Sequence, residues 1–172
     1  MDLEQLKFPI GNFVKPQEIT EQQITTWIDE IAALPQQLIE TFSTISKEKL
    51  NTPYRPGGWT LKQVVHHIAD SHMNSYIRFK LACTEDNPSI RPYFEDRWAE
   101  LNDAKFADVQ VSLSLISALH GRWVLFLKSM KSEDWEKTFF HPESKKTTQL
   151  KEVVGIYAWH GKHHLNHLKL VK

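Results

Sequence analysis

The chain has little cysteine, no excess of either charge and no long apolar run. Its one cysteine, Cys83, cannot form an intramolecular disulfide, so the fold does not depend on a disulfide framework. The 21 basic residues equal the 21 acidic ones in number. The chain therefore lacks the long-range positive field that binding to nucleic acid or to an anionic membrane usually needs, and we expect neither as a partner.

Two further absences concern the location of the protein. We find no apolar stretch that approaches the ~18–20 residues needed to span a bilayer. The N-terminal residues, Met1 to Gln5, lack the basic and apolar regions of a signal peptide. We therefore expect a cytoplasmic protein.

Four long stretches carry apolar residues at the 3.6-residue spacing of an amphipathic helix. The first follows Thr20, which is a good N-cap, and it contains Pro35, where we expect a kink or a break. The second begins after Thr60 and the third near Asp108. The fourth follows Thr148, which we expect to cap it.

The segments between these helices are polar or irregular. Residues 85–107 carry two prolines and four aromatic residues, and a loop of this length tends to be functional or to cover something. His141 to Thr147 form a polar turn that suits a short hairpin. Four amphipathic helices of ~20–28 residues predict an all-α fold, a four-helix bundle that forms a single domain over residues 1–172.

The chain contains nine histidines, and seven of them lie in two of the predicted helices. His160 and His164 are one helical turn apart within an apolar stripe, a placement in which two imidazoles can grip one metal ion. A catalytic site with an open position needs about three protein ligands. The third must come from the other cluster: His66, His67 and His72.

The helical pattern does not decide which histidine of that cluster is the third ligand. His66 points away from the apolar arc and is expected to be solvated, whereas His72 lies nearer the centre of the arc. His67 lies at its edge, in line with polar residues that would form one wall of a cavity in the bundle. These are Ser71, Asn74 and Arg78. This row of polar residues favours His67 slightly over His72 as the third ligand.

The remaining histidines carry weaker signals, and several familiar catalytic motifs are absent. His66, His163 and His167 are predicted to be surface residues or hydrogen-bond partners of a metal ligand. His120 and His141 fit no pattern. A zinc-protease helix would read His-Glu-x-x-His, but Gly-Lys-His separates the pair here. The chain also has no Gly-x-Ser-x-Gly elbow and no phosphate-binding glycine loop.

Several segments closely resemble the DinB superfamily, and within it the YfiT branch, whose members are described as metal-dependent hydrolases. They are Gly58-Trp59-Thr60, the run from Val65 to His72, Arg91-Pro92-Tyr93 and His160-x-x-x-His164. The resemblance implies a four-helix bundle, commonly a homodimer. It also implies one divalent ion per chain, zinc or nickel, bound by His67, His160 and His164.

Such a site would activate water to hydrolyse a small-molecule substrate. Ser71, Asn74 and Arg78 would orient that substrate, although Arg78 could instead form an interhelical salt bridge. Asp70 could support a ligand histidine, and the sequence identifies no general base.

Two alternatives remain open at the level of sequence. The first is S-transfer from a low-molecular-weight thiol of the bacillithiol type, because a bound thiol would also ionise. The second is a non-catalytic bundle whose structural metal has His72 or His163 as a fourth ligand.

Overall fold

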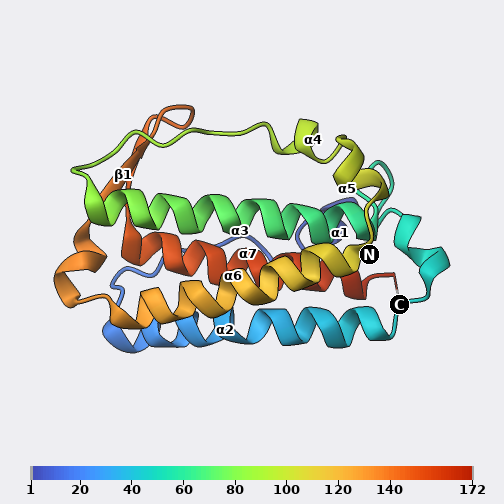
Figure 1. Cartoon of the computed structure of the whole chain (residues 1–172), viewed down its shortest axis with the longest axis horizontal. Coiled ribbons are helices and arrows are strands. Elements are labelled where there is room, and N and C mark those ends of the chain that lie inside the picture. The colour runs from blue at the N-terminus through green and yellow to red at the C-terminus, as the bar shows by residue number, and fades with distance from the viewer. Residues whose placement is uncertain (1, 172) are drawn as a thin grey trace.

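The computed structural model describes residues 2–171 and has four long helices packed side by side (Figure 1). These are α2 (Glu21–Ser43), α3 (Leu61–Thr84), α6 (Val109–Ser129) and α7 (Leu150–Lys169). The shorter elements are α1 (Leu3–Lys7), η1 (Lys47–Asn51), α4 (Glu95–Trp98), α5 (Asn102–Phe106), η2 (Ser132–Glu136), β1 (Thr138–His141) and β2 (Lys146–Gln149). The predicted four-helix bundle and the short hairpin are both confirmed.

Side-chain caps account for the starts of three long helices, because each satisfies a backbone N–H of the first turn. Thr20 accepts from the Gln23 backbone, Thr60 forms a full capping box, and Asp108 accepts from the Gln110 backbone. The prediction that Thr148 caps the fourth helix was wrong. Thr148 belongs to β2, where it pairs with Phe139, and the N-cap of α7 is Gln149.

Pro35 does not break α2, which continues for two further turns beyond it. Proline has no N–H, so the carbonyl of Ile31, four residues earlier, receives no hydrogen bond from it. That carbonyl instead lies 2.7 Å from His120 Nδ1 on α6. The proline therefore frees a backbone acceptor that faces the interior of the bundle.

The four long helices do not simply alternate in direction along the chain (Figure 1). Helices α2 and α7 run one way, and α3 and α6 run the other way, because the connection after α3 returns along the length of the bundle. This crossover is tied to the hairpin, since the Ile90 N–H donates to the Phe140 carbonyl and the Phe140 N–H donates to the Pro88 carbonyl. A crossover connection of this kind lets two parallel helices share one bundle.

Two apolar clusters fill the interior, one towards each end of the bundle. The first surrounds Trp123 and Phe79, and the second surrounds Leu38 and Ile68. By position along each helix, His120 of α6 and His160, His163 and His164 of α7 fall between the two clusters. A polar layer therefore divides the core, and its side chains need partners because burial of an unpaired polar group is costly.

The expectation about membrane-spanning segments was too strict. Among the described residues α6 is long and apolar enough to cross a membrane, judged by length and composition alone. The inner face of α6 packs on α2 and α3, where Ile116, Trp123 and Leu127 are almost completely buried. The core helix of a bundle passes the same test of length and composition.

Two helical glycines should respond in opposite ways to alanine. A Cβ at Gly155 on α7 would lie only 2.8–2.9 Å from three atoms of the Trp27 ring, whereas one at Gly121 on α6 meets no described atom within 4 Å. We expect Gly155→Ala to lower the free energy of unfolding by ~1–3 kcal/mol through overpacking. Gly121→Ala should raise it by up to ~1 kcal/mol through helix propensity. Urea denaturation of both variants measures this, and a neutral Gly155→Ala would contradict the close packing.

Candidate metal centre

His67 on α3 and His160 and His164 on α7 bring one ring nitrogen each within 4.8 Å of the others. His67 Nε2 lies 3.2 Å from His160 Nε2. Two nitrogens that each bind one ion at ~2.0–2.1 Å with a tetrahedral angle are ~3.3 Å apart. The spacing of this pair therefore fits a shared divalent ion. All three members of the group are histidines, so each would offer an imidazole nitrogen to that ion.

The three side chains differ in exposure but share a low basicity. His67 and His164 are buried, whereas His160 is partly exposed. Burial, followed by the nearby His163, lowers the pKa of His67 to about 4. Burial also holds the pKa values of His160 and His164 well below the usual value. All three rings are neutral at pH 7, and a neutral imidazole keeps one lone pair for a metal ion.

His72 lies behind His160, and both of its ring nitrogens are already engaged. Its Nε2 is 3.1 Å from His160 Nδ1, and its Nδ1 is 2.9 Å from His120 Nε2. His72 is completely buried, as the helical pattern suggested, but this pairing leaves no nitrogen for an ion. The structure thus brings His67 rather than His72 to the α7 pair, and metal binding by the three remains a prediction.

A second group of histidines shares His164 with the first. It consists of His163, His164 and His167, whose ring nitrogens also lie within 4.8 Å of one another. His167 Nδ1 is 3.3 Å from His164 Nδ1, and His167 Nε2 is 3.0 Å from the carbonyl of Lys7 on α1. His167 is therefore a partner of a predicted ligand, and α1, which the sequence did not predict, supplies its anchor.

Two other histidines were misread from the sequence. His66 is buried rather than solvated, and its Nδ1 lies 2.7 Å from the Ser112 hydroxyl on α6, because α5 and α6 cover that side of α3. His120, which carried no signal, is only 1% exposed and contacts both His72 and the carbonyl of Ile31. The one local clue to its role was Pro35, which leaves that carbonyl free.

A cavity of about 510 Å³ opens beside His160. Its walls come from α3, the crossover, the hairpin and α7, so the expectation that the long loop covers something is confirmed. The lining residues include Ser71, Arg78, Tyr93, Glu95, Arg97, His141, Glu143, Tyr157 and His160. A candidate metal ligand is thus open to a space large enough for a small molecule.

The three polar residues that the sequence assigned to substrate binding have different surroundings. Ser71 and Arg78 line the cavity, whereas the Asn74 amide donates to the Asp70 carbonyl one turn earlier. Within residues 2–171 the Arg78 guanidinium has no ion-pair partner, and its buried Nε has no hydrogen-bond acceptor. The alternative interhelical salt bridge is therefore not formed. A buried unpaired donor of this kind is costly unless a ligand completes it.

The cavity also has acidic and phenolic groups that the sequence did not identify. Burial raises the pKa of Glu95, and Asp96 and Glu143 add to the effect. Burial likewise raises the pKa of Tyr93, so its hydroxyl remains a hydrogen-bond donor at neutral pH. Tyr93, Glu95 and Asp96 come from the crossover and Glu143 comes from the hairpin turn, and no periodic pattern marks either segment.

Asp70 does not support a ligand histidine in this structure. Burial, followed by Asp103, raises its pKa to about 6. Among the hydrogen bonds of the described residues, none joins its carboxylate to a histidine of the site.

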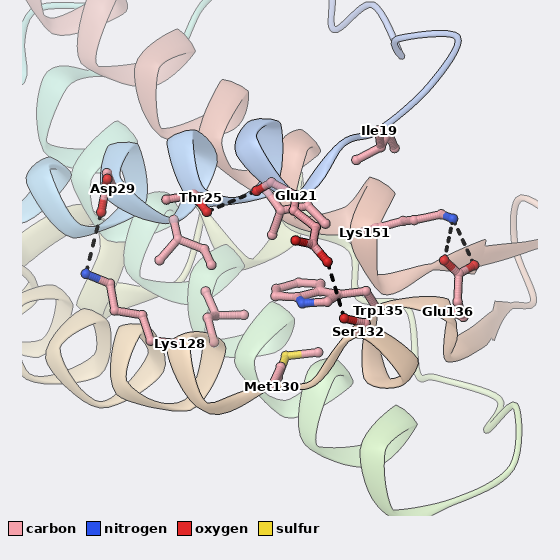
Figure 2. Close-up of a pocket in the computed structure, with 13 residues that line it drawn as sticks. Ile19, Glu21, Thr25, Asp29, Lys128, Met130, Ser132, Trp135, Glu136 and Lys151 are labelled. Carbon is pink, nitrogen blue, oxygen red and sulfur yellow. Dashed lines mark hydrogen bonds and ion pairs between the residues drawn. The ribbon is translucent and has the colours of Figure 1, made fainter.

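A larger hollow, of about 610 Å³, lies at a different place, where α2 begins and α6 ends (Figure 2). Its floor is apolar and includes Trp135 and Met130. The charged groups of its rim are already paired with one another or with a neighbouring hydroxyl: Lys151 with Glu136, Lys128 with Asp29, and Glu21 with Ser132. The cavity beside His160 contains the unpaired Arg78 guanidinium and is therefore the better candidate for chemistry.

A helical bundle with a histidine site between facing helices defines a class of metal-binding protein, and comparison with known proteins places this chain within it. Residues 30–168 match the DinB superfamily, and the chain belongs to that family. A Bacillus cereus protein named "Putative metal-dependent hydrolase" is 54% identical over 166 residues, covering 96% of this chain and 95% of the relative. A Bacillus thuringiensis relative with a name of the same form has the same identity and coverage.

A solved structure has the same fold. It is described as "YfiT from Bacillus subtilis is a probable metal-dependent hydrolase with an unusual four-helix bundle topology". The two chains are 44% identical and superpose with a TM-score of 0.93, covering 96% of this chain and 94% of the other. The arrangement of parallel and antiparallel helices described above agrees with that topology.

Proposed function

We propose that this protein is a metal-dependent hydrolase that acts on a small molecule. His67, His160 and His164 hold one divalent ion per chain, zinc or nickel. The observation that carries the proposal is the 3.2 Å approach of two histidine Nε2 atoms beside a cavity of about 510 Å³. Neutral imidazoles at this spacing suit such an ion, and the cavity leaves room for a substrate next to His160.

When bound, an ion held by three neutral imidazoles supplies a Lewis acid that makes water acidic enough to ionise near neutral pH. The chain's own residues bind and orient the substrate. Arg78 offers an unsatisfied planar donor to a carboxylate or a similar anion, and Ser71 adds a hydroxyl elsewhere in the lining of the same cavity. Tyr93 adds a phenolic donor. The Asn74 amide already donates to the Asp70 carbonyl, so Asn74 is the weakest member of the proposed substrate set.

The proposal includes the cellular and quaternary context of the protein. The whole chain, residues 1–172, acts as one metal-binding domain in the cytoplasm, and two chains form a homodimer. Exposed apolar side chains on the outer face of α6 support the dimer, because such residues commonly mark an interface. They are Val111, Leu115 and Leu125.

Metal analysis and an activity assay on untagged protein test the proposed function. We expect about one zinc or nickel per chain and hydrolysis of at least one carboxylate-bearing ester or amide from a panel. Chelation should abolish the activity and leave the helical circular dichroism intact. Arg78→Gln should raise KM for such a substrate while the metal stays bound, and Arg78→Lys should recover part of the loss. Loss of folding on chelation would contradict the proposal and favour a structural ion.

The same assay separates hydrolysis from thiol transfer. Each electrophile of the panel is tested with and without an added low-molecular-weight thiol, and the products are identified by mass spectrometry. Hydrolysis yields a product that has gained water and is indifferent to the thiol. A thioether product that forms only when thiol is present would replace the hydrolase proposal with S-transfer.

A further inference from the structure

We propose that His72, His120 and His167 are positioning residues that place the protons of the two α7 histidines. They hold the proton of His160 and of His164 on Nδ1, so that the Nε2 lone pairs of both rings face the shared ion. The role of these protons in metal binding rests on the proposed function, but the proton positions themselves can be observed without any metal.

The first chain of hydrogen bonds begins at a backbone carbonyl, which can only accept. The Ile31 carbonyl is 2.7 Å from His120 Nδ1, so His120 carries its proton there. A neutral imidazole has one N–H, so His120 Nε2 is an acceptor and must receive the proton of His72 Nδ1, 2.9 Å away. His72 Nε2 is then also an acceptor, and His160 Nδ1 donates to it across 3.1 Å.

The directions of all these bonds follow from Pro35. An ordinary residue at that position would donate its own N–H to the Ile31 carbonyl, as each turn of a helix does. Proline cannot, so that carbonyl is free to accept from His120. One residue on α2 thus determines the proton position on α7 through two intervening rings.

The second chain is shorter and has the same logic. The Lys7 carbonyl on α1 is 3.0 Å from His167 Nε2, which must donate to it. His167 Nδ1 is then an acceptor, and His164 Nδ1, 3.3 Å away, donates to it. His164 therefore keeps its lone pair on Nε2, as His160 does.

Burial makes these assignments firm. His72, His120 and His167 are each at most 1% exposed, so water does not offer competing partners. An imidazole free in water favours the proton on Nε2, the atom that the site needs unprotonated. Partners that hold the other ring nitrogen commonly set the tautomer and orientation of a metal-bound histidine. Here other histidines act as those partners, and two carbonyls end the chains.

Long-range proton–nitrogen NMR correlation on the metal-free protein at pH 7.5 tests the proton positions directly. We expect His160, His164, His72 and His120 to carry the proton on Nδ1, and His167 to carry it on Nε2. Finding the proton on Nε2 of His160 or His164 would overturn the inference. Because no ion is present, this result does not depend on whether the protein is a hydrolase.

Variants of His120 test the consequence for metal binding. His120→Phe keeps a ring but removes the acceptor for His72, so His72 can reverse its tautomer and push the proton of His160 onto Nε2. We expect zinc affinity, measured by competition with a chromophoric chelator, to fall by about 10–100-fold, the loss typical of such partners. His120→Gln, whose amide oxygen can accept from His72, should recover most of the affinity. A phenylalanine variant with unchanged affinity would overturn the inference.

A matched control variant, and variants in the second chain of hydrogen bonds, distinguish the proposed effect on metal binding from a merely structural effect. His66→Asn alters another buried histidine that bonds to Ser112 and to no proposed ligand, and it should leave zinc affinity unchanged. If His120→Phe fails to fold, His167→Phe and His167→Asn repeat the comparison on the second chain of hydrogen bonds, which runs from Lys7 through His167 to His164. The asparagine oxygen can replace Nδ1 of His167 as the acceptor. Should wild-type protein show the expected tautomers but bind no zinc or nickel, the proposed function would fail while the proton assignments stand.

Discussion

His160→Ala is expected to leave the protein without bound metal and without hydrolytic activity, whereas His163→Ala should retain both. The two residues are a matched pair, because each belongs to only one of the two histidine groups that share His164. Removal of a direct ligand should weaken zinc binding by more than the ~10–100-fold typical for the loss of a ligand's hydrogen-bond partner. His164→Ala should behave like His160→Ala.

Metal content by elemental analysis and zinc competition measure this difference. Circular dichroism and urea denaturation of each metal-free variant check that the fold is retained. If His163→Ala lost the ion and His160→Ala kept it, the ion would be bound by the second group of histidines. If all three variants kept one ion per chain, neither group would be the site.

The metal-free protein is expected to lose stability steeply as the pH falls from about 6.5 towards 4. Burial lowers the pKa of His120 to about 4, and the same value applies to His67, His163 and His167. Below the ordinary value of ~6.5 the unfolded chain binds protons that the folded chain does not, so the free energy of unfolding decreases as the pH falls. The stabilising contribution of the neutral histidines is fully present above pH ~6.5 and is lost by about pH 4.

The size of this effect follows from the shift in pKa. Lowering the pKa from about 6.5 to about 4 in one almost completely buried group corresponds to roughly 3 kcal/mol. Two such groups, His67 and His120, together reach the lower part of the ~5–15 kcal/mol that stabilises an ordinary domain. Asp70 acts in the opposite direction, because its pKa is raised to about 6 and its protonation favours the folded state. The histidines outnumber it, so the net change is a loss of stability.

Urea denaturation of chelated protein at pH 7.5, 6 and 5 measures the loss. His120→Gln removes one of the titrating groups, and its stability should therefore depend less on pH than that of the wild type. His141→Gln is the control, because His141 lies at the hairpin and is not among the buried histidines. A wild-type stability that stays constant from pH 7.5 to 5 would contradict the neutral polar layer.

The sequence by itself determined the helices and half of the candidate site. Apolar periodicity and the caps at Thr20, Thr60 and Asp108 are properties of neighbouring residues, so they can be read without knowing what packs against them. The spacing of His160 and His164 is equally local, because residues four apart lie on one face of a helix.

Only the tertiary structure decided which histidine of α3 joins His160 and His164 in one group. His67 and His72 both lie near the apolar arc and both contact His160, but the group whose ring nitrogens lie within 4.8 Å of one another contains His67. The tertiary structure also decided the roles of His120 and His66, whose partners come from other helices. The crossover, the free Ile31 carbonyl and the α1 anchor at Lys7 join segments far apart in the chain. Such contacts leave no periodic mark in the sequence, because each depends on how two separate elements meet.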